Sequence, residues 1–485
     1  MKNSIIKILI AALVLSAASC KKVINRDYVE GVATANFYKN SNDAESGLLG
    51  CYNKTLSWDV YGKFLFYSDI SSDDIEWFTP GGDLQNLEIR SLLINSNTEV
   101  GGLWGSCYNA LANINLLVDK VQALPENKFL PTTRKKEILA EAHGLRAYIY
   151  WNMLQFWGGV PLVLTFPTST DREVNQVARN SAAEVLAQIK ADLVIADADL
   201  PVKFFNPLLQ PDQNLINAKG RFTQGAAKAL QLRILMEEKD WTGAVAKAQE
   251  VTAMGEFIIN PKFVPIFRSN DGGQNTKESI WESQSVELPG QFDNTGVLKF
   301  FYTGPPKVGA TQSLYDSYGP VGNTDVRREQ SMFRQTDPVF IYAQKYKNFY
   351  SNDPNDNYIL FRYAEVLLNK AEALNELAYP STEALDIVNS FRARAEDETF
   401  RFGACTGIPV KTLADAPTQA AMRQLIYDEK RREMTQEGIR WFDMLRRDKA
   451  AAAAAVGITD QDKLLFPIPQ GERDRNPKLE QNPGY

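Results

Sequence analysis

The stretch YDEKRREMTQEGIRWFDMLRR, from Tyr427 to Arg447, carries the most information about the fold. Its glutamates recur at every fourth position, as Glu429, Glu433 and Glu437. Its arginines fall three or four positions from acidic residues, as Arg432 and Arg440 do. Residues three and four apart are neighbours on a helix, so this spacing predicts a charged helix with opposite charges paired along its surface.

Gly438 interrupts this predicted helix. A glycine inside a helix costs about 1 kcal/mol relative to alanine. Such a residue is expected where the helix bends or where another backbone packs closely against it. Gly438 therefore predicts one of these two features at the middle of the charged stretch.

The charged residues of the stretch also raise the possibility of a glycosidase. Such enzymes use two carboxylates about 5 to 10 Å apart, and one of them needs a raised pKa. Adjacent guanidinium groups lower a carboxyl pKa instead. We therefore interpret the cluster as a structural ion-pair lattice, composed of Glu429, Arg432, Glu433, Glu437, Arg440 and Asp443.

The order RRE followed by EGIRWFD resembles the closing motif of the SusD/RagB family, the lipid-anchored nutrient-binding partners of TonB-dependent outer-membrane transporters. The final residues, LFPIPQGERDRNPKLEQNPGY, agree with the family pattern. Further blocks resemble family segments in the family's order: AHGLRAYIYWNMLQFWGGVPLV (142–163), FRYAEVLLNKAEALNE (361–376) and ALDIVNSFRARA (384–395). The resemblance thus extends over nearly the full length.

Apolar residues at helical spacing predict a mainly α fold with a helical core over about 104–256 and 358–450. The predicted helices are 104–121, 136–156, 182–200, 222–236, 241–251, 361–376, 384–395 and the region around 419–447. They follow no strict repeat period, so the residues support only degenerate helical repeats. The family resemblance implies that these pairs are tetratricopeptide-like, with long loop-rich insertions.

The N-terminus predicts a lipoprotein signal peptide over residues 1–19. Lys2 and Lys7 precede or flank an apolar run, Ile8–Leu15, which is too short to cross a bilayer. Small residues stand directly before Cys20, which we expect to be lipidated and to anchor residues 20–485, a single domain. The resemblance implies an outer-membrane location on the cell-surface face.

Composition argues against several classes of site. The net charge of −6 offers no electrostatic attraction to nucleic acid. Beyond Cys20 the cysteines are Cys51, Cys107 and Cys405, widely spaced, which favours buried free thiols over a metal site. His143 is the single histidine and lies in a predicted helix, so neither a catalytic triad nor a zinc site is expected. We predict no metal and no cofactor.

Two regions, about 56–103 and 257–357, are rich in Gly, Pro, Asn and Asp and concentrate aromatic residues. Long loops in a compact protein are usually functional, and their aromatic content argues against disorder. A sugar ring needs a flat aromatic platform with polar groups at its edge. The predicted ligand-binding residues are Trp58, Asp74, Trp77, Tyr302 and Tyr318.

Some of these positions also have structural interpretations. Asp73 and Asp74 equally suit a cap on the turn before Trp77. Asp325 and Arg327 resemble the family's DxR element, for which we favour a structural salt bridge over a ligand contact. We expect the joint loss of the Trp77 and Tyr302 rings to weaken ligand binding with little change in melting temperature.

The resemblance implies a non-catalytic receptor that captures oligosaccharides and delivers them to a SusC-like TonB-dependent transporter. Two alternatives stay open on the sequence alone. The cargo is an oligopeptide, as in RagB-like lipoproteins, or the chain is a tetratricopeptide-type scaffold that binds other proteins and no small ligand.

Overall fold

The structure is a computed structural model that describes residues 37–485, apart from 168–175, 206–217, 268–272, 285–307, 320–324, 337–338, 347–356, 397–398, 401–402 and 405–407. The predicted signal peptide and lipidation site, Cys20, lie outside the described residues, as do Tyr302 and Cys405. None of the helices in the described part of the chain is long and apolar enough to span a membrane.

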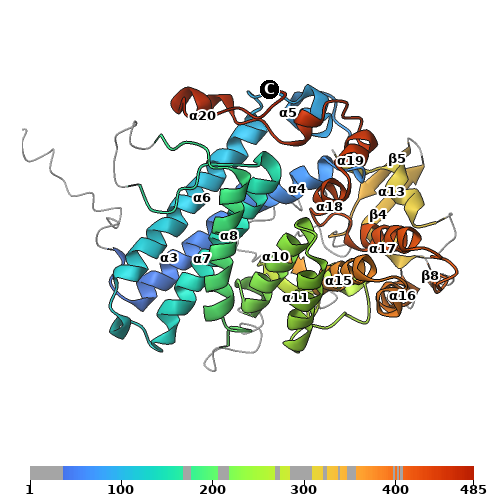
Figure 1. The fold of residues 1–485 in the computed structure, drawn as a ribbon, viewed down its shortest axis with the longest axis horizontal. Coiled ribbons are helices and arrows are strands. Elements are labelled where there is room, and N and C mark those ends of the chain that lie inside the picture. Colours follow the sequence, from blue (N-terminus) through green and yellow to red (C-terminus); the bar gives the residue numbers. More distant parts are fainter. Residues whose placement is uncertain are drawn as a thin grey trace, which may run out of the picture.

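Helices make up most of the described chain, which confirms the predicted fold class (Figure 1). The longer helices are α3 (Ser41–Thr55), α4 (Lys63–Ile70), α6 (Thr98–Ala123), α7 (Thr133–Trp157), α8 (Ala182–Asp199), α10 (Gln224–Glu237), α11 (Trp241–Ala253), α15 (Tyr363–Leu377), α16 (Thr382–Glu396), α17 (Gln419–Met434) and α18 (Arg440–Arg447). The shorter ones are α5 (Gly82–Glu88), α13 (Gln312–Ser317), α14 (Val326–Ser331), α19 (Lys449–Ala455) and α20 (Gln470–Arg475). Single turns and one short π-helix complete them: η1 (Trp58–Gly62), η2 (Arg90–Leu92), η3 (Glu126–Lys128), η4 (Val264–Phe267) and η6 (Gln461–Leu464).

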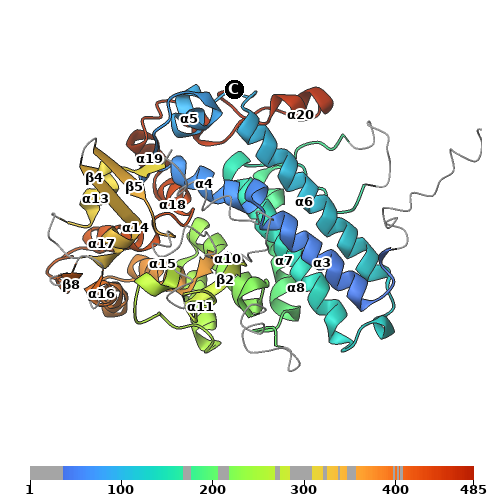
Figure 2. The ribbon, with the colours of Figure 1, turned by 180° about the vertical axis from the view of Figure 1, so that it is seen from behind.

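The long helices form a side-by-side array. α6 packs on α7, α7 on α8, α10 on α11, and α11 on α15, which in turn packs on α16 and α17. Figures 1 and 2 show this array from its two faces, with α3 and α6 at one end and α16 and α17 at the other. The predicted helical ranges therefore correspond to real elements, and their successive pairing agrees with the degenerate repeats that the sequence indicates.

Local sequence explains where these helices begin and which face they bury. Asn97 caps α6 by accepting hydrogen bonds from the backbone N–H groups of Glu99 and Val100. Ser181 and Glu184 form a capping box at the start of α8. α6 buries a stripe at three- and four-residue spacing: Val100, Leu103, Trp104, Cys107, Leu111, Ile114, Leu117, Val118 and Val121. α7 is buried on most sides because it lies between α6 and α8.

The charged stretch 427–447 departs from its prediction as one helix. α17 ends at Met434 and α18 begins at Arg440, and between them Gln436 and Gly438 have positive φ values of 61° and 72°. A Cβ on Gly438 would lie 2.9 Å from the Cα of Leu65 in α4. Gly438 therefore marks both a change of direction and a close backbone approach, the two features that its position predicts.

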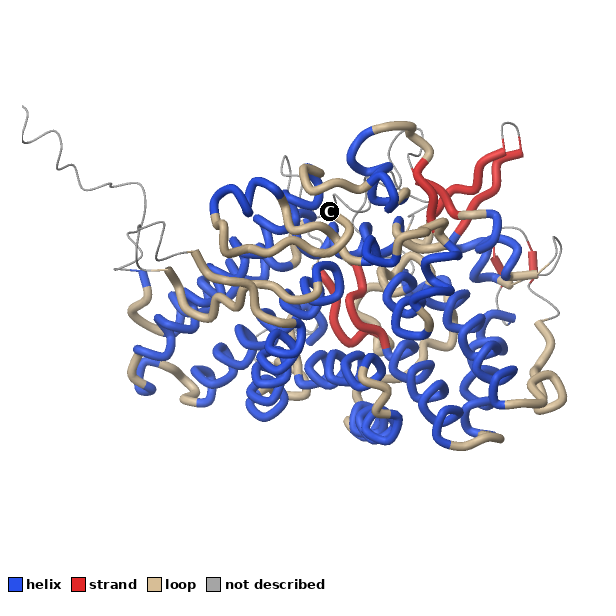
Figure 3. The backbone as a smooth tube through the Cα atoms, turned by 45° about the horizontal axis from the view of Figure 1, so that its top comes forward, coloured by secondary structure: helices blue, strands red, loops and turns tan. Residues whose placement is uncertain are grey.

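The regions predicted as loops contain regular structure. In the described chain, region 56–103 holds short helices and a strand, and region 257–357 holds further strands that the sequence does not predict. The strands of the whole described chain are β1 (Ile75–Trp77), β2 (Ser279–Ser283), β3 (Val308–Ala310), β4 (Met332–Thr336), β5 (Val339–Ala343), β6 (Tyr358–Arg362), β7 (Thr399–Phe400) and β8 (Gly403–Ala404). Four of them form an antiparallel sheet in the order β1-β3-β5-β4. Figure 3 shows β4 and β5 projecting from one end of the helical body.

Candidate functional site

The glutamates of the charged stretch lie inside the protein. Arg327 Nη1 donates to Glu429 Oε1 at 2.6 Å and to Glu433 Oε2 at 3.3 Å. Arg362 donates through Nη1 to Glu433 Oε1 and through Nη2 to Glu437 Oε1, both at 2.6 Å. Glu429 and Glu433 are 0% exposed. The predicted ion-pair lattice is confirmed, but its predicted position on a helix surface is wrong, because these arginines come from α14 and β6.

Asp325 and Arg327 form the structural salt bridge that the sequence favours. Asp325 caps α14 by accepting the backbone N–H of Arg327 at 3.0 Å. The Arg327 guanidinium also donates to both Asp325 carboxylate oxygens, through Nε at 2.9 Å and Nη2 at 2.7 Å. Arg327 is thus fixed from one side while it pairs with α17 on the other.

Two arginines connect the lattice to β1. Arg440 donates to both carboxylate oxygens of Asp73, through Nε at 2.7 Å and Nη2 at 2.8 Å. Arg431 Nε donates to Asp74 Oδ1 at 2.6 Å. A bidentate pair fixes geometry more strictly than a point charge does. The turn before β1 is therefore held in place by residues more than 350 positions away.

The remaining charged residues of the motif are also paired. Arg432 Nη2 donates to Glu429 Oε2 at 2.8 Å, the i,i+3 pair that the spacing predicts. Asp443 lies 2.6 Å from Lys430 Nζ and accepts from Arg446 Nε at 2.8 Å. All members of the motif thus hold structural elements together.

The electrostatics of the lattice do not suit a catalytic acid. Burial alone would raise the pKa of Glu429, but the charges of Arg327, Arg432 and Arg392 outweigh it and lower the pKa to about 2. The pKa of Glu433 is lowered in the same way, against its burial, by Arg394, Arg362 and Arg327. A general acid needs the opposite shift, so these carboxylates do not offer the pair that a glycosidase requires.

Among the predicted ligand-binding residues, Trp58 and Trp77 come together. Both rings flank Phe66 of α4, with ring centroids 6.1 Å and 6.5 Å from it. Both are half-buried and pack against the main core. Trp77 ends β1, opposite Val308 of β3, and points to the same face as the buried Ile75.

Asp74 and Tyr318 are buried and interact with other protein groups. Asp74 is 1% exposed and pairs with Arg431. Tyr318 is 3% exposed, and its hydroxyl donates to the backbone carbonyl of Arg432 at 2.8 Å. We therefore correct these two predictions, because neither side chain offers a free face to a ligand here. Tyr302 precedes β3 in the sequence and lies outside the described residues.

The outward face of the four-stranded sheet carries a row of aromatic rings that we call the aromatic ladder: Phe78, Phe333, Phe340 and Tyr342. Directly opposed residues of antiparallel strands point to the same face. Glu76 opposes Gly309, Gly309 opposes Tyr342, and Tyr342 opposes Phe333, so one row crosses the whole sheet. The opposite face buries Ala310, Met332 and Ile341 against Leu314, Tyr315 and Tyr318.

The rings of the ladder lie in continuous contact. Phe333 and Tyr342 stack with centroids 6.0 Å apart and planes at 8°, and Phe340 lies 6.3 Å from Tyr342. Phe78 lies 5.0 Å from Phe340 and covers Gly309, whose added Cβ would lie 2.0 Å from the Phe78 ring. Phe333 is 46% exposed. Gly309 is thus the position that lets the Phe78 ring lie flat on the sheet.

Polar groups border the aromatic ladder. Tyr342 donates its hydroxyl hydrogen to Gln335 Oε1 at 2.6 Å. Glu76 lies at the β1 end of the same row, and burial raises its pKa. A flat apolar platform with hydroxyl, amide and carboxylate groups at its edge can accept a ring that has one apolar face and a polar rim.

Comparison with known proteins agrees with the fold and motifs. Residues 238–459 match the model of the SusD family, and residues 53–235 match a model described as "Starch-binding associating with outer membrane". The chain belongs to the SusD family.

Relatives within the SusD family align over nearly the whole chain. SusD-like protein P38 of Formosa agariphila is 27% identical over 528 residues, covering 100% of this chain and 99% of the relative. SusD-like protein P25 of the same organism is 25% identical, and the alignment covers 90% of this chain and 88% of P25. The SusD resemblance read from the sequence is confirmed.

Solved structures share this SusD fold. A SusD homologue from Bacteroides thetaiotaomicron superposes with a TM-score of 0.75 at 20% identity, over 95% of this chain and 99% of that one. Surface glycan-binding protein A from Bacteroides fluxus superposes with a TM-score of 0.71 at 24% identity, over 92% of this chain and 99% of that one. A laminarin-binding SusD-like protein superposes with a TM-score of 0.71 at 21% identity, over 92% of this chain and 100% of that one.

The sequence analysis of this SusD-family chain missed the aromatic ladder. Phe78 belongs to the aromatic-rich region 56–103 that was predicted to bind ligand, but Trp77 was selected as the contact there, and Phe333, Phe340 and Tyr342 were not named. The available signal is the alternation of β4 (MFRQT) and β5 (VFIYA), in which every second residue is polar or aromatic and faces outward. Pairing with β3 is needed to place these rings beside Phe78.

Within the described residues, no cluster of acidic, cysteine and histidine side chains could hold a metal ion. His143 Nδ1 lies 2.8 Å from Asp192 Oδ1, which also accepts from Arg146 Nη2 at 2.7 Å. Cys51 and Cys107 are buried free thiols, as predicted. These polar groups are engaged inside the helical array.

Proposed function

We propose that this SusD-family protein is a non-catalytic receptor that binds oligosaccharides on the aromatic ladder. The observation that carries the proposal is the row from Glu76 to Phe333 across the sheet, with aromatic rings facing outward and aliphatic residues facing inward. A solvent-facing sheet surface normally carries polar residues. Stacked rings on that face are costly to leave in water and are explained by a ligand that covers them.

Pyranose rings suit this surface. Their C–H faces pack on aromatic rings, and their hydroxyl groups reach acceptors and donors at the rim. Glu76, Gln335 and the Tyr342 hydroxyl provide such groups. The matching family model is described as starch-binding, and similar proteins are named for laminarin and surface glycans, which supports the same class of cargo.

Three of the predicted contacts remain part of the proposal. Trp58 and Trp77 lie beside Phe66, with Trp77 on the opposite face of β1 from the aromatic ladder, and Tyr302 precedes β3 in the sequence. We propose that these three residues contact the ligand separately from the ladder. Asp74 and Tyr318 support the sheet through Arg431 and the α17 backbone.

We further propose that Cys20 carries a lipid anchor, that the protein sits on the outer face of the outer membrane, and that it delivers cargo to a SusC-like TonB-dependent transporter. Family membership supports this assignment. Substitution of Cys20 by Ala is expected to move the protein from the membrane fraction to the soluble fraction. Copurification of a large outer-membrane channel with the anchored protein tests the partner.

Affinity electrophoresis in gels containing laminarin, starch or xylan tests the binding surface. The double variant Phe333→Ala/Tyr342→Ala is expected to bind its glycan at least about tenfold more weakly, since loss of two ring contacts removes about 1.4 kcal/mol or more. The matched control is Phe205→Ala, which removes an exposed ring outside the sheet. Unchanged retardation of the ladder variant would place the glycan elsewhere.

Two further assays on the purified protein distinguish a glycan receptor from an enzyme and from a peptide-binding protein. Steady release of reducing ends by the wild-type protein would contradict a non-catalytic role. Binding of oligopeptides with no retardation by any glycan would favour the RagB-like alternative.

A further inference from the structure

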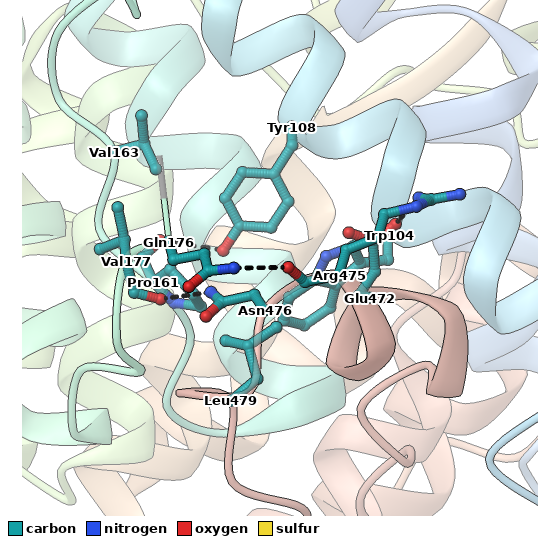
Figure 4. Close-up of a pocket in the computed structure, with 10 residues that line it drawn as sticks. All are labelled: Trp104, Tyr108, Pro161, Val163, Gln176, Val177, Glu472, Arg475, Asn476 and Leu479. Carbon is teal, nitrogen blue, oxygen red and sulfur yellow. Dashed lines mark hydrogen bonds and ion pairs between the residues drawn. The ribbon is translucent and has the colours of Figure 1, made fainter. Parts of the chain in front are cut away.

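A concave site lies at the end of the molecule opposite to the aromatic ladder. A cavity of about 560 Å³ separates α6 from the C-terminal segment around α20. Tyr108 and Trp104 of α6 form its back, and Val163, Val177 and Leu479 form apolar walls (Figure 4). This volume falls within the range of small-molecule sites, about 300–1,000 Å³.

Hydrogen bonds hold an arch over this cavity. Gln176 Nε2 donates to the carbonyl of Arg475 at 2.9 Å, and Asn476 Nδ2 donates to the carbonyl of Val177 at 2.7 Å. Lys478 Nζ donates to the carbonyl of Gln176 at 3.0 Å. Figure 4 shows the first two bonds near the hydroxyl end of the Tyr108 ring. Segments about 300 positions apart in sequence are thereby joined.

Arg179 fixes the base of the arch. Its guanidinium donates to the carbonyls of Gly159 at 2.6 Å, Trp157 at 2.9 Å and Glu480 at 3.2 Å, and to Asn482 Oδ1 at 2.6 Å. An apolar cavity normally costs stability because its walls lose packing contacts. Here side-chain bonds to both segments keep the walls apart, which is the arrangement expected of a preformed binding site.

From this geometry we infer that the cavity between α6 and α20 is a second ligand site, and that it takes a neutral monosaccharide or disaccharide. The Tyr108 ring provides the apolar platform, and its hydroxyl, which donates to the carbonyl of Pro161 at 2.9 Å, retains acceptor capacity. Gln176 and Glu472 place amide and carboxylate oxygens on the lining for sugar hydroxyls. Glu472 pairs with Arg475 at 2.8 Å, so the lining has no net charge that would select an ion.

This site is independent of the aromatic ladder. Figures 1 and 2 place α20 and α6 at one end of the molecule and β4 and β5 at the other. The cavity is a partly open hollow with room for one or two sugar rings, whereas the ladder is a flat surface that suits a longer chain. The inference therefore goes beyond the proposed function and does not depend on it.

Saturation-transfer NMR with glucose, galactose, mannose, xylose, fucose, cellobiose, lactose and laminaribiose tests the inference. We expect at least one of these sugars to receive saturation from the wild-type protein. In the Phe333→Ala/Tyr342→Ala background, which removes binding at the ladder, Val177→Trp puts an indole into the cavity and is expected to abolish that signal, while Val410→Trp, at a side chain 66% exposed and outside the cavity, retains it. The variant Phe333→Ala/Tyr342→Ala should retain it as well.

A milder pair of variants guards against misfolding of Val177→Trp. Glu472→Gln is expected to weaken sugar binding by about fivefold through loss of a charge-assisted hydrogen bond. Its control, Glu480→Gln, lies on the same segment but does not line the cavity. The inference is overturned if no sugar of the panel gives a signal, or if the signal survives in both Val177→Trp and Glu472→Gln. Loss of the signal only in the ladder variant also overturns it and leaves the proposed function intact.

Discussion

At the scale of single residues, Gly438 joins the ion-pair lattice to the N-terminal part of the chain. Its φ of 72° is unfavourable for other residues, and an added Cβ would meet the Leu65 backbone. Its backbone N–H also donates to the buried Asp69 Oδ1 at 3.1 Å. A larger residue here must strain its own backbone and displace α4 as well.

We therefore expect Gly438→Ala to lower the free energy of unfolding by about 2–4 kcal/mol, combining backbone strain with a steric clash. The control is Gly457→Ala, because Gly457 has the same φ of 72° but no atom within 4 Å of the added Cβ. This variant is expected to lose only about 1 kcal/mol. Urea unfolding measures both, and equal losses would show that the contact with Leu65 is unimportant.

Trp77 and Phe333 differ in how firmly they are packed. Trp77 rests on Phe66 and the core, while Phe333 is 46% exposed. We expect Trp77→Ala to reduce stability by about 3 kcal/mol, and Phe333→Ala to reduce it by less than about 1 kcal/mol. Thermal melting tests this. The packing of Trp77 argues against the expectation from sequence that the joint loss of the Trp77 and Tyr302 rings changes the melting temperature little. A Trp77→Ala variant that melts like the wild type would show that the ring is free.

At the scale of elements, α17 depends on its buried carboxylates. Burial opposes the charged form of Glu429, but three arginines lower its pKa from the ordinary 4.5 to about 2. A carboxyl group with a lowered native pKa stabilises the fold above its unfolded pKa and loses that contribution as the pH falls toward the native value. The stabilisation is therefore present at neutral pH and is lost between about pH 4.5 and pH 2.

We expect the contribution of Glu429 to the free energy of unfolding to change little from neutral pH down to about 5.5 and to fall steeply below about 4.5. Glu429 should account for on the order of 3 kcal/mol of this fall. In Glu429→Gln the slope below about pH 4.5 should be smaller, and stability at neutral pH lower by about 3–5 kcal/mol, because buried guanidinium groups lose their partner. Urea titrations across pH measure both, with Glu480→Gln as an exposed control. A slope unchanged by Glu429→Gln would contradict the assignment.

The helices could be predicted from sequence because periodicity and caps are local properties. The partners of α17 could not. Glutamates at four-residue spacing are typical of an exposed helix, and only the packed fold brings Arg327, Arg362 and Arg394 to them. The aromatic ladder could not be predicted for the same reason. The alternation within β4 and β5 is local, but the row from Glu76 to Phe333 depends on strands that are far apart in the chain.

At the scale of the whole molecule, the helical array separates two surfaces of different shape. The sheet at one end is flat and aromatic, and the arch at the other end borders a partly open cavity. The lattice around α17 and the clamp from Arg440 to Asp73 connect the sheet to the array. The buried charged residues of the lattice thus stabilise the framework.

This division of roles predicts how binding responds to salt. The chain carries a net charge of −6 at pH 7, but contacts between sugar rings and the aromatic ladder involve no ligand charge. Raising NaCl from about 50 mM to about 500 mM should therefore change the affinity for neutral laminarin or starch by less than about twofold. A cationic peptide would instead bind more weakly as its attraction to the protein is screened, and an anionic glycan more tightly as repulsion is screened. Isothermal titration across this range distinguishes the cargo classes, and a tenfold loss of affinity with salt would contradict a neutral oligosaccharide as the cargo.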